Sequence, residues 1–349
     1  MFHRRRGHAA LPVLLAAALS LTACGSSSGG SSADEKGPEA AETAKSSVAV
    51  GGKDFSEAAD RTAAMGTAAK PGEFPRTITH ALGTTEIPAR PERVVVLDVG
   101  ELDNVVSLGV KPVGYAPTEG SPELPSYLKQ DAGSPKNVGT INNLNLEAIA
   151  ALKPDLILGS QLRAADKYRA LAKIAPTVFS IRPGFTWKQN YLLNAASLDR
   201  TTRAEARLAE YEKEADALGE RLGADKPSVT MVRFMPGKIR LYAKQSFIGT
   251  ILEDVGVPRP RNQQADTLAV EVSPERIDEA DADFVFTGVY GAPDKTSRTR
   301  TRTTPLWKSL RAVKDGHAFD VSDETWYLGL GVTAAEEVLG DLEGFLVGG

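Results

Sequence analysis

Arginine and aromatic side chains follow several of the predicted strands of this chain. Such residues could form a binding site, because arginine and tyrosine donate hydrogen bonds to oxygen atoms and aromatic faces cover organic surface. Each also has a structural alternative, a solvated arginine on a loop or an aromatic ring in the core. The candidates are Arg163, Trp187, Arg233, Tyr242, Tyr290, Trp326 and Tyr327.

Residues that would support catalysis or hold a bare metal ion are scarce. Of the four histidines, only His80 and His317 lie beyond the first 23 residues. Zinc and manganese sites need clustered histidines and carboxylates. No GxSxG turn joins a predicted strand to a helix, and Ser246 has no evident His and Asp partners. We therefore expect no catalytic residue, no protein-held metal and no cofactor.

The first 23 residues have the pattern of a targeting segment. Arg4, Arg5 and Arg6 precede an apolar stretch, residues 9–21, that is too short for a stable transmembrane helix. The sequence Leu-Thr-Ala-Cys ending at Cys24, the single cysteine, resembles the lipobox of bacterial lipoproteins. This resemblance implies cleavage before Cys24, a lipid on its sulfur, and a location on the outer face of the cell membrane.

The next segment, residues 24–75, is rich in Ser, Gly, Ala and Glu and is typical of a flexible tether. About fifty flexible residues would reach roughly 40 Å. The whole chain carries a net charge of −4, and loss of the three arginines of residues 1–23, which hold no acidic residue, would make it −7. We therefore expect no nucleic-acid partner.

One long helix, Thr202 to Leu222, divides the remaining sequence into two similar halves. Its apolar residues recur every three or four positions, and about 30 Å of helix would span a small domain. A surface helix within one large domain is the alternative. Strands alternate with helices on both sides, which predicts two three-layer α/β lobes with mostly parallel central sheets, joined by this single helix. The expected parts are 1–23 signal peptide, 24–75 tether, 76–200 first lobe, 201–223 connecting helix and 224–349 second lobe.

The two halves also share a weak internal echo. Residues 145–159 and 273–288 each place a glutamate at the start of a short helix and continue through an acidic residue into a strand ending at glycine. The echo is consistent with a duplicated lobe and equally with ordinary strand–helix patterns. The loop 291–304 carries Arg298, Arg300 and Arg302, which we interpret as solvated, with a place at the rim of the ligand cleft as the alternative.

From about residue 76 onward the chain resembles the substrate-binding lipoproteins of iron–siderophore and vitamin B12 ABC importers. The resemblance rests on the order and spacing of four motifs: NLEAIAALKPDLILGS (145–160), LAKIAPTVF (171–179), SFIGTILEDVG (246–256) and SDETWYLG (322–329). It implies two α/β lobes joined by one helix, with the ligand held between them. It also implies a monomeric binding protein that delivers its ligand to a membrane permease, with no enzymatic activity.

The resemblance assigns roles to four residues. Glu147 and Glu275 match the glutamates, one per lobe, that dock onto permease arginines, although simple helix capping is the alternative. Arg163 and Tyr327 match positions that face the ligand. A ferric siderophore is a bulky organic complex with oxygen atoms on its surface, so aromatic faces with a few arginine and tyrosine donors suit it.

One departure from the family pattern bears on the ligand. Relatives that complete the iron shell have a histidine shortly before the second docking glutamate, and this chain has Leu268 there. With two candidate arginines, the site suits a neutral or weakly charged complex, such as a ferric hydroxamate of the ferrioxamine type. Cobalamin or haem is the alternative ligand. We also expect modest lobe motion, because a single helix is a stiff hinge.

Overall fold

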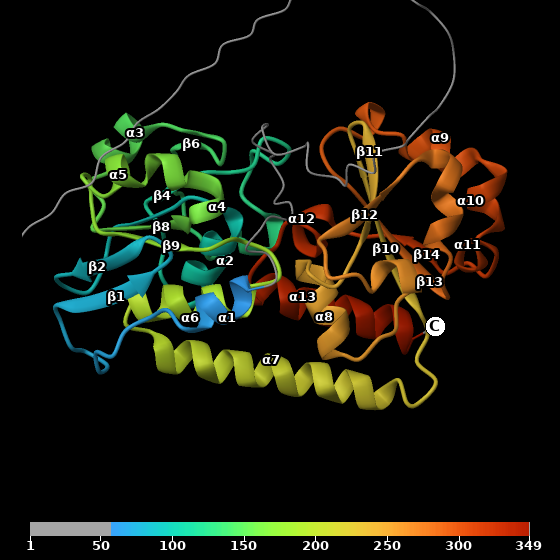
Figure 1. Cartoon of the computed structure of the whole chain (residues 1–349), viewed down its shortest axis with the longest axis horizontal. Helices are drawn as coiled ribbons and strands as arrows, with labels where there is room; N and C mark the ends of the chain where they lie inside the picture. The colour runs from blue at the N-terminus through green and yellow to red at the C-terminus, as the bar shows by residue number, and fades with distance from the viewer. Residues whose placement is uncertain (1–56, 349) are drawn as a thin grey trace, which may run out of the picture. The chain divides into compact units, whose positions relative to one another are not determined.

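The computed structural model describes residues 57–348, which fold into two α/β lobes (Figure 1). The signal peptide, Cys24 and most of the predicted tether lie outside these residues. None of the helices within residues 57–348 is both long and apolar enough to cross a bilayer.

The first lobe contains a sheet of five parallel strands. Alternate residues of its central strand point to opposite faces: Val94 and Val96 enter one apolar core, and Val95 enters another. Helices cover both faces, as predicted. In spatial order the strands are β5 (Lys136–Asn137), β4 (Gly114–Tyr115), β3 (Val94–Val96), β8 (Leu156–Ser160) and β9 (Thr177–Ser180).

The second lobe also has a five-stranded sheet, in which four strands run in one direction and one runs opposite to them. Val229 and Met231 face the core shared with the first lobe, whereas Val232 and Phe234 face a separate core that includes Trp307. The spatial order is β12 (Ala269–Val272), β11 (Lys238–Tyr242), β10 (Val229–Met235), β13 (Phe284–Val289) and β14 (Ala318–Asp320).

Two hairpins and a series of helices complete the described residues. The hairpins are β1 (Arg76–His80) with β2 (Gly83–Ile87), and β6 (Gly139–Thr140) with β7 (Asn143–Leu144). The first lobe has α1 (Ala58–Ala63), α2 (Val99–Ser107), α3 (Leu146–Ala151), α4 (Gln161–Ala164), α5 (Tyr168–Leu171), α6 (Trp187–Ser197) and the short η1 (Ser126–Leu128) and η2 (Ala165–Lys167). The second has α8 (Phe247–Asp254), α9 (Arg298–Thr303), α10 (Pro305–Ser309), α11 (Arg311–Lys314), α12 (Asp323–Trp326), α13 (Val332–Leu346) and the short η3 (Arg261–Gln263), η4 (Pro274–Ala280) and η5 (Pro293–Lys295).

The predicted long helix is α7 (Thr201–Arg221), which runs along both lobes (Figure 1). Its buried residues form the stripe seen in the sequence, and Gly223 follows it with the positive φ of a left-handed helix end. The helix is not the only contact between the lobes. Helix α13 of the second lobe packs against α2, α6 and α7.

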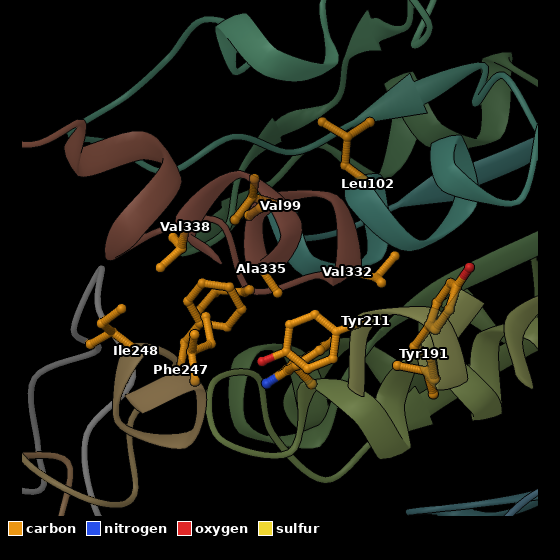
Figure 2. Close-up of a cluster of buried hydrophobic side chains, with 14 of the residues drawn as sticks. Val99, Leu102, Tyr191, Tyr211, Phe247, Ile248, Val332, Ala335 and Val338 are labelled. Atoms are coloured by element: carbon orange, nitrogen blue, oxygen red, sulfur yellow. The ribbon is translucent and has the colours of Figure 1, made fainter. Parts of the chain in front are cut away.

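A single apolar core therefore continues from one lobe into the other (Figure 2). Besides strands of both sheets, its contributors include residues of α2, α6, α7, α8 and α13. Burial of apolar surface across this junction opposes separation of the lobes. The labelled side chains of Figure 2 are Val99, Leu102, Tyr191, Tyr211, Phe247, Ile248, Val332, Ala335 and Val338.

Three features differ from the sequence predictions. Residues 57–75 were expected in a flexible tether with a short helix near residues 55–65; the helix is present as α1, but it packs on α6 and buries Ala58 and Thr62. The sequence of residues 164–174 predicts one helix, and the structure instead divides this segment among α4, η2 and α5. The hairpin of β1 and β2 was not predicted, because its strands alternate polar and apolar residues only weakly.

Candidate functional site

The first lobe places a buried ion pair at the carboxyl ends of its central strands. The chain leaves β3 toward β4 on one side and later returns to β8 on the other, which is the switch point where α/β sheets bind ligands. Asp98 follows β3 and caps α2 by accepting the Val99 N–H at 2.8 Å. Arg163, in α4 directly after β8, donates from Nε to Asp98 Oδ2 at 3.0 Å.

A second arginine of this lobe, Arg182, was missed in the sequence. It follows β9, is 4% exposed, and its guanidinium lies 5.3 Å from the centre of the Phe185 ring. Burial, and to a smaller extent the positive charge of Arg163, lower the pKa of Arg182 to about 9. The strand-end rule that selected Arg163 would also have found Arg182, because both follow parallel strands that are neighbours in the sheet.

The second lobe builds a cluster around Arg233 near the end of β10. Its Nε donates to Asp323 Oδ1 at 2.7 Å and its Nη1 to Tyr242 Oη at 3.1 Å. Its guanidinium lies 4.7 Å from the ring centre of Tyr290 and 5.4 Å from that of Tyr327. Although burial opposes the charge, Tyr242 and Asp323 raise the pKa of Arg233. The structure thus brings four predicted residues together.

Tyr327 has a different place in this cluster from the one expected. Its hydroxyl donates toward the carbonyl oxygens of Val232 and Phe286, each at 3.1 Å, and its ring is 3% exposed. Its ring packs 5.0 Å from that of Tyr242. In this arrangement the Tyr327 ring packs against Arg233 and Tyr242. Its contact with a ligand stays a prediction.

Arg240 is a further buried arginine that sequence reasoning missed. It pairs directly with Arg233 across β10 and β11, so both side chains point to the same face of the sheet. Its Nε donates to Glu271 Oε1 at 3.0 Å, while its Nη1 is buried without a hydrogen-bond partner among residues 57–348. No sequence signal marks this residue, because it lies inside an antiparallel strand rather than at the end of a parallel one.

A hydrogen bond joins the first lobe to the Arg233 cluster of the second. The Gly120 N–H, in the loop beyond β4, donates to Tyr290 Oη at 3.1 Å. In the first lobe, the buried hydroxyls of Thr118, in the same loop, and Ser160, at the end of β8, have no hydrogen-bond partner within the described part of the chain. Buried polar atoms are normally satisfied, so these hydroxyls suit a polar ligand or ordered water.

Trp187 and Trp326 are not brought to this site. Trp187 is fully buried in the junction between the lobes, where its ring packs against Tyr211 and its Nε1 donates to Thr250 Oγ1 at 2.9 Å. Trp326 is fully buried beside Phe286, and its Nε1 donates to Asp341. Both are therefore core residues. The sequence placed them near strand ends but carried no information about the direction of their side chains.

The predicted docking glutamates are both exposed. Glu147 lies in the first turn of α3, whose N-cap is Asn145, and Glu275 lies in η4. A hydrogen bond from Ser273 is the main cause that lowers the pKa of Glu275. The internal echo is visible in the fold, since α3 leads into β8 and η4 leads into β13, each beside the first strand of its sheet.

The arginine-rich segment is ordered by ion pairs instead of lying free. Arg298 and Arg302 both donate to Asp320 at the end of β14, at 2.6 and 2.9 Å. Against the effect of burial, these arginines and Thr287 lower the pKa of Asp320 to about 2. The segment expected to be a solvated loop therefore contains the helix α9.

The two histidines within residues 57–348 lie apart, one in each lobe. His80 is buried in the first lobe, which lowers its pKa to about 4, and His317 stacks on Phe284 in the second. Leu268 is buried and its carbonyl accepts the Ala243 N–H. Residues 57–348 contain no cluster of His, Cys, Asp and Glu that could hold a metal ion.

A cavity of about 730 Å³ lies away from these residues, beside α1 and the start of α7, and none of the predicted ligand residues lines it.

Comparison with known proteins identifies the class to which this fold and site belong. Residues 94–325 match the periplasmic binding protein family. The chain is 36% identical to the probable siderophore-binding lipoprotein YfiY of Bacillus subtilis, over 78% of this chain and 88% of that protein. It is 31% identical to the Fe(3+)-citrate-binding protein YfmC of the same organism, over 75% and 82%.

A solved structure agrees with this match. SirA of Staphylococcus aureus, crystallised with staphyloferrin B, superposes with a TM-score of 0.70 at 33% identity, over 78% of this chain and 98% of SirA. The chain belongs to the periplasmic binding protein family. It is a substrate-binding protein and not an enzyme, and the predicted two-lobe α/β fold is confirmed.

Proposed function

We propose that this protein captures a ferric siderophore outside the cytoplasm and delivers it to the permease of an ABC importer. The proposal rests on the buried arginines and tyrosines that each lobe places at or near its strand ends, with a Gly120–Tyr290 hydrogen bond between the lobes. Its relatives include proteins named for siderophore and ferric citrate binding. The bound ferric complex is cargo, and the protein needs no cofactor of its own.

The charge of the site favours an anionic complex. Four buried arginines, Arg163, Arg182, Arg233 and Arg240, belong to the two groups of residues. Arginine donors recognise carboxylate oxygens, so an anionic ferric chelate with carboxylate donors suits this set of side chains.

A ferric hydroxamate of the ferrioxamine type is the competing ligand, as predicted from the sequence. That prediction assumed two arginines in the site, and Arg182 and Arg240 remove this assumption. Cobalamin and haem remain the alternatives within the same family. All of these ligands are compared in the test below.

The anchoring and the docking belong to the same proposal. A lipid on Cys24 would hold the protein at the outer face of the cell membrane, and YfiY is also named a lipoprotein. Glu147 and Glu275, exposed on opposite lobes, would each contact an arginine of the permease. The protein would work as a monomer.

Ligand titration tests the proposed cargo. The purified protein is titrated with ferric citrate, ferrioxamine B, ferric enterobactin, cobalamin and haem, and binding is followed by calorimetry and native mass spectrometry. We expect a retained anionic ferric complex with submicromolar Kd. Removing the charge of Arg240 by Arg240→Gln should weaken that complex at least tenfold. Tight binding of cobalamin alone, or of ferrioxamine B in preference to every anionic complex, would contradict the proposal.

A further inference from the structure

Glu101 is a buried carboxyl group beside the site for which the proposed function has no role so far. It lies in the first turn of α2 and is 2% exposed. Its Oε2 has no hydrogen-bond partner among the residues that the structure describes. A buried, unpartnered carboxyl oxygen is costly unless the group is neutral or faces a ligand.

The position of Glu101 is set by the same helix that Asp98 caps. Glu101 lies three positions after Asp98, so the two side chains are close to each other at the first turn. Asp98 already accepts the Arg163 Nε at 3.0 Å and is 1% exposed. An ionised Glu101 would therefore add a second negative charge to one buried arginine that has its own carboxylate partner.

This geometry explains why the pKa of Glu101 is raised. Burial, followed by the negative charge of Asp98, raises the pKa of Glu101 to about 8, and the charge of Arg163 only partly offsets this. At neutral pH the carboxyl group is therefore largely protonated. Of the elements around α2, β4 places Tyr115 toward Asp98. Tyr191 of α6 faces the far end of α2, near Ser107.

We propose that Glu101 is a positioning residue that keeps the first-lobe half of the site positive by remaining protonated while an anionic ferric chelate is bound. It acts through Arg163, whose charge toward the ligand an ionised Glu101 would offset. The inference rests on the proposed function and specifies the ligand as anionic. Binding then retains a proton on Glu101 that the empty protein releases above neutral pH.

The consequence is a specific dependence of affinity on pH. If the bound anion keeps Glu101 protonated, the affinity falls by up to tenfold per pH unit above about pH 8. A glutamine at this position is neutral at every pH, so its affinity has no such fall. Replacing Asp98 removes the neighbouring negative charge, lowers the pKa of Glu101 and moves the fall to lower pH.

The test compares four proteins with one probe. Wild type, Glu101→Gln, Asp98→Asn and the exposed control Glu92→Gln are titrated with ferric dicitrate in excess citrate between pH 6.5 and 9.0, with circular dichroism as a check of folding. We expect wild type and Glu92→Gln to lose about tenfold in affinity toward pH 9. Glu101→Gln should stay within twofold of its own value at pH 6.5, and the fall of Asp98→Asn should begin at lower pH.

The outcomes separate the two proposals. Binding with the same pH profile in wild type and Glu101→Gln overturns the role of Glu101 alone. Absence of binding in wild type and the Glu92→Gln control at every pH overturns the proposed ligand and the proton coupling with it. A calorimetric comparison in two buffers of different ionisation enthalpy gives an independent readout, since wild type should take up protons on binding at pH 8 and Glu101→Gln fewer.

Discussion

Replacing Trp187 with phenylalanine tests whether this residue supports the junction between the lobes or contacts the ligand. In the structure the indole is fully buried and bridges the lobes, since it starts α6 in the first lobe and donates to Thr250 of α8 in the second. Its ring meets those of Tyr211 and Phe247 edge to face, with centres 5.1 and 5.9 Å apart. A structural role predicts a loss of stability without a loss of affinity.

The size of the loss follows from the contacts removed. Phenylalanine cannot donate to Thr250, which costs about 1 kcal/mol for a partly buried hydrogen bond and leaves the threonine oxygen less well satisfied. Losing about three buried ring atoms adds about 1–2 kcal/mol from lost burial and the space left behind. The free energy of unfolding should fall by about 2–3 kcal/mol, which corresponds to roughly 4–12 °C in Tm for a domain of this size.

Thermal unfolding by circular dichroism and titration calorimetry measure the two quantities separately. Trp307→Phe is the matched control, because Trp307 is also buried but packs on Phe234 in the separate core of the second lobe. We expect Trp187→Phe to bind the ferric ligand within threefold of wild type. A variant with unchanged Tm and tenfold weaker binding would show that Trp187 contacts the ligand and that the structural reasoning is wrong.

Three further predictions concern docking, the contact between the lobes and the response to pH. The double variant Glu147→Arg/Glu275→Arg should bind the ligand with unchanged affinity but should not support transport in cells. The control Glu214→Arg, on the exposed side of α7, should support normal transport. Normal transport by the double variant would exclude docking through these two glutamates. Gly120→Ala would place its Cβ 2.3 Å from the facing tyrosine ring, so the loop must shift, and we expect at least fivefold weaker binding; an unchanged Kd would show that this contact does not shape the site. Burial raises the pKa of Asp103 to about 6 from its ordinary 3.8, so the unfolded chain releases this proton at lower pH than the folded protein does. Between pH 4.5 and 7 the free energy of unfolding of wild type should therefore fall by about 2 kcal/mol relative to that of Asp103→Asn, as measured by urea unfolding. A difference between the two proteins that stays constant with pH would refute this.

The positions of most elements could be predicted because their signals are local. The apolar stripe of α7 is a pattern of three and four residues, and the apolar strand β8 follows Pro154 within a few residues. The short helix after Asn145 formed where a capping residue precedes it, and the Asn145 side chain accepts the Ala148 N–H at 2.9 Å. The split of the helix at 164–174 was not predicted, and Arg163 at its start is held by Asp98, 65 residues away in sequence.

The candidate site was predicted only in part, namely for the residues that carry a local signal in the sequence. Arg163, Arg233 and Tyr290 follow or end parallel strands, and the strand-end rule is enough to select them. Trp187 satisfied a similar rule, yet its side chain enters the junction between the lobes. Arg240 has no local signal at all. Its position next to Arg233 depends on the register between β10 and β11.

The sequence by itself determined the two α/β halves, the helix along them, the scarcity of metal ligands and the family resemblance, because each of these depends on composition or on residues close together in the chain. Only the tertiary structure decided which side chains meet. The pairing of Arg233 with Arg240, the contact of Gly120 with Tyr290 and the burial of Glu101 depend on strand register and on packing between distant segments. A shift of one residue in a strand would turn each side chain to the opposite face, and no local pattern specifies that choice completely.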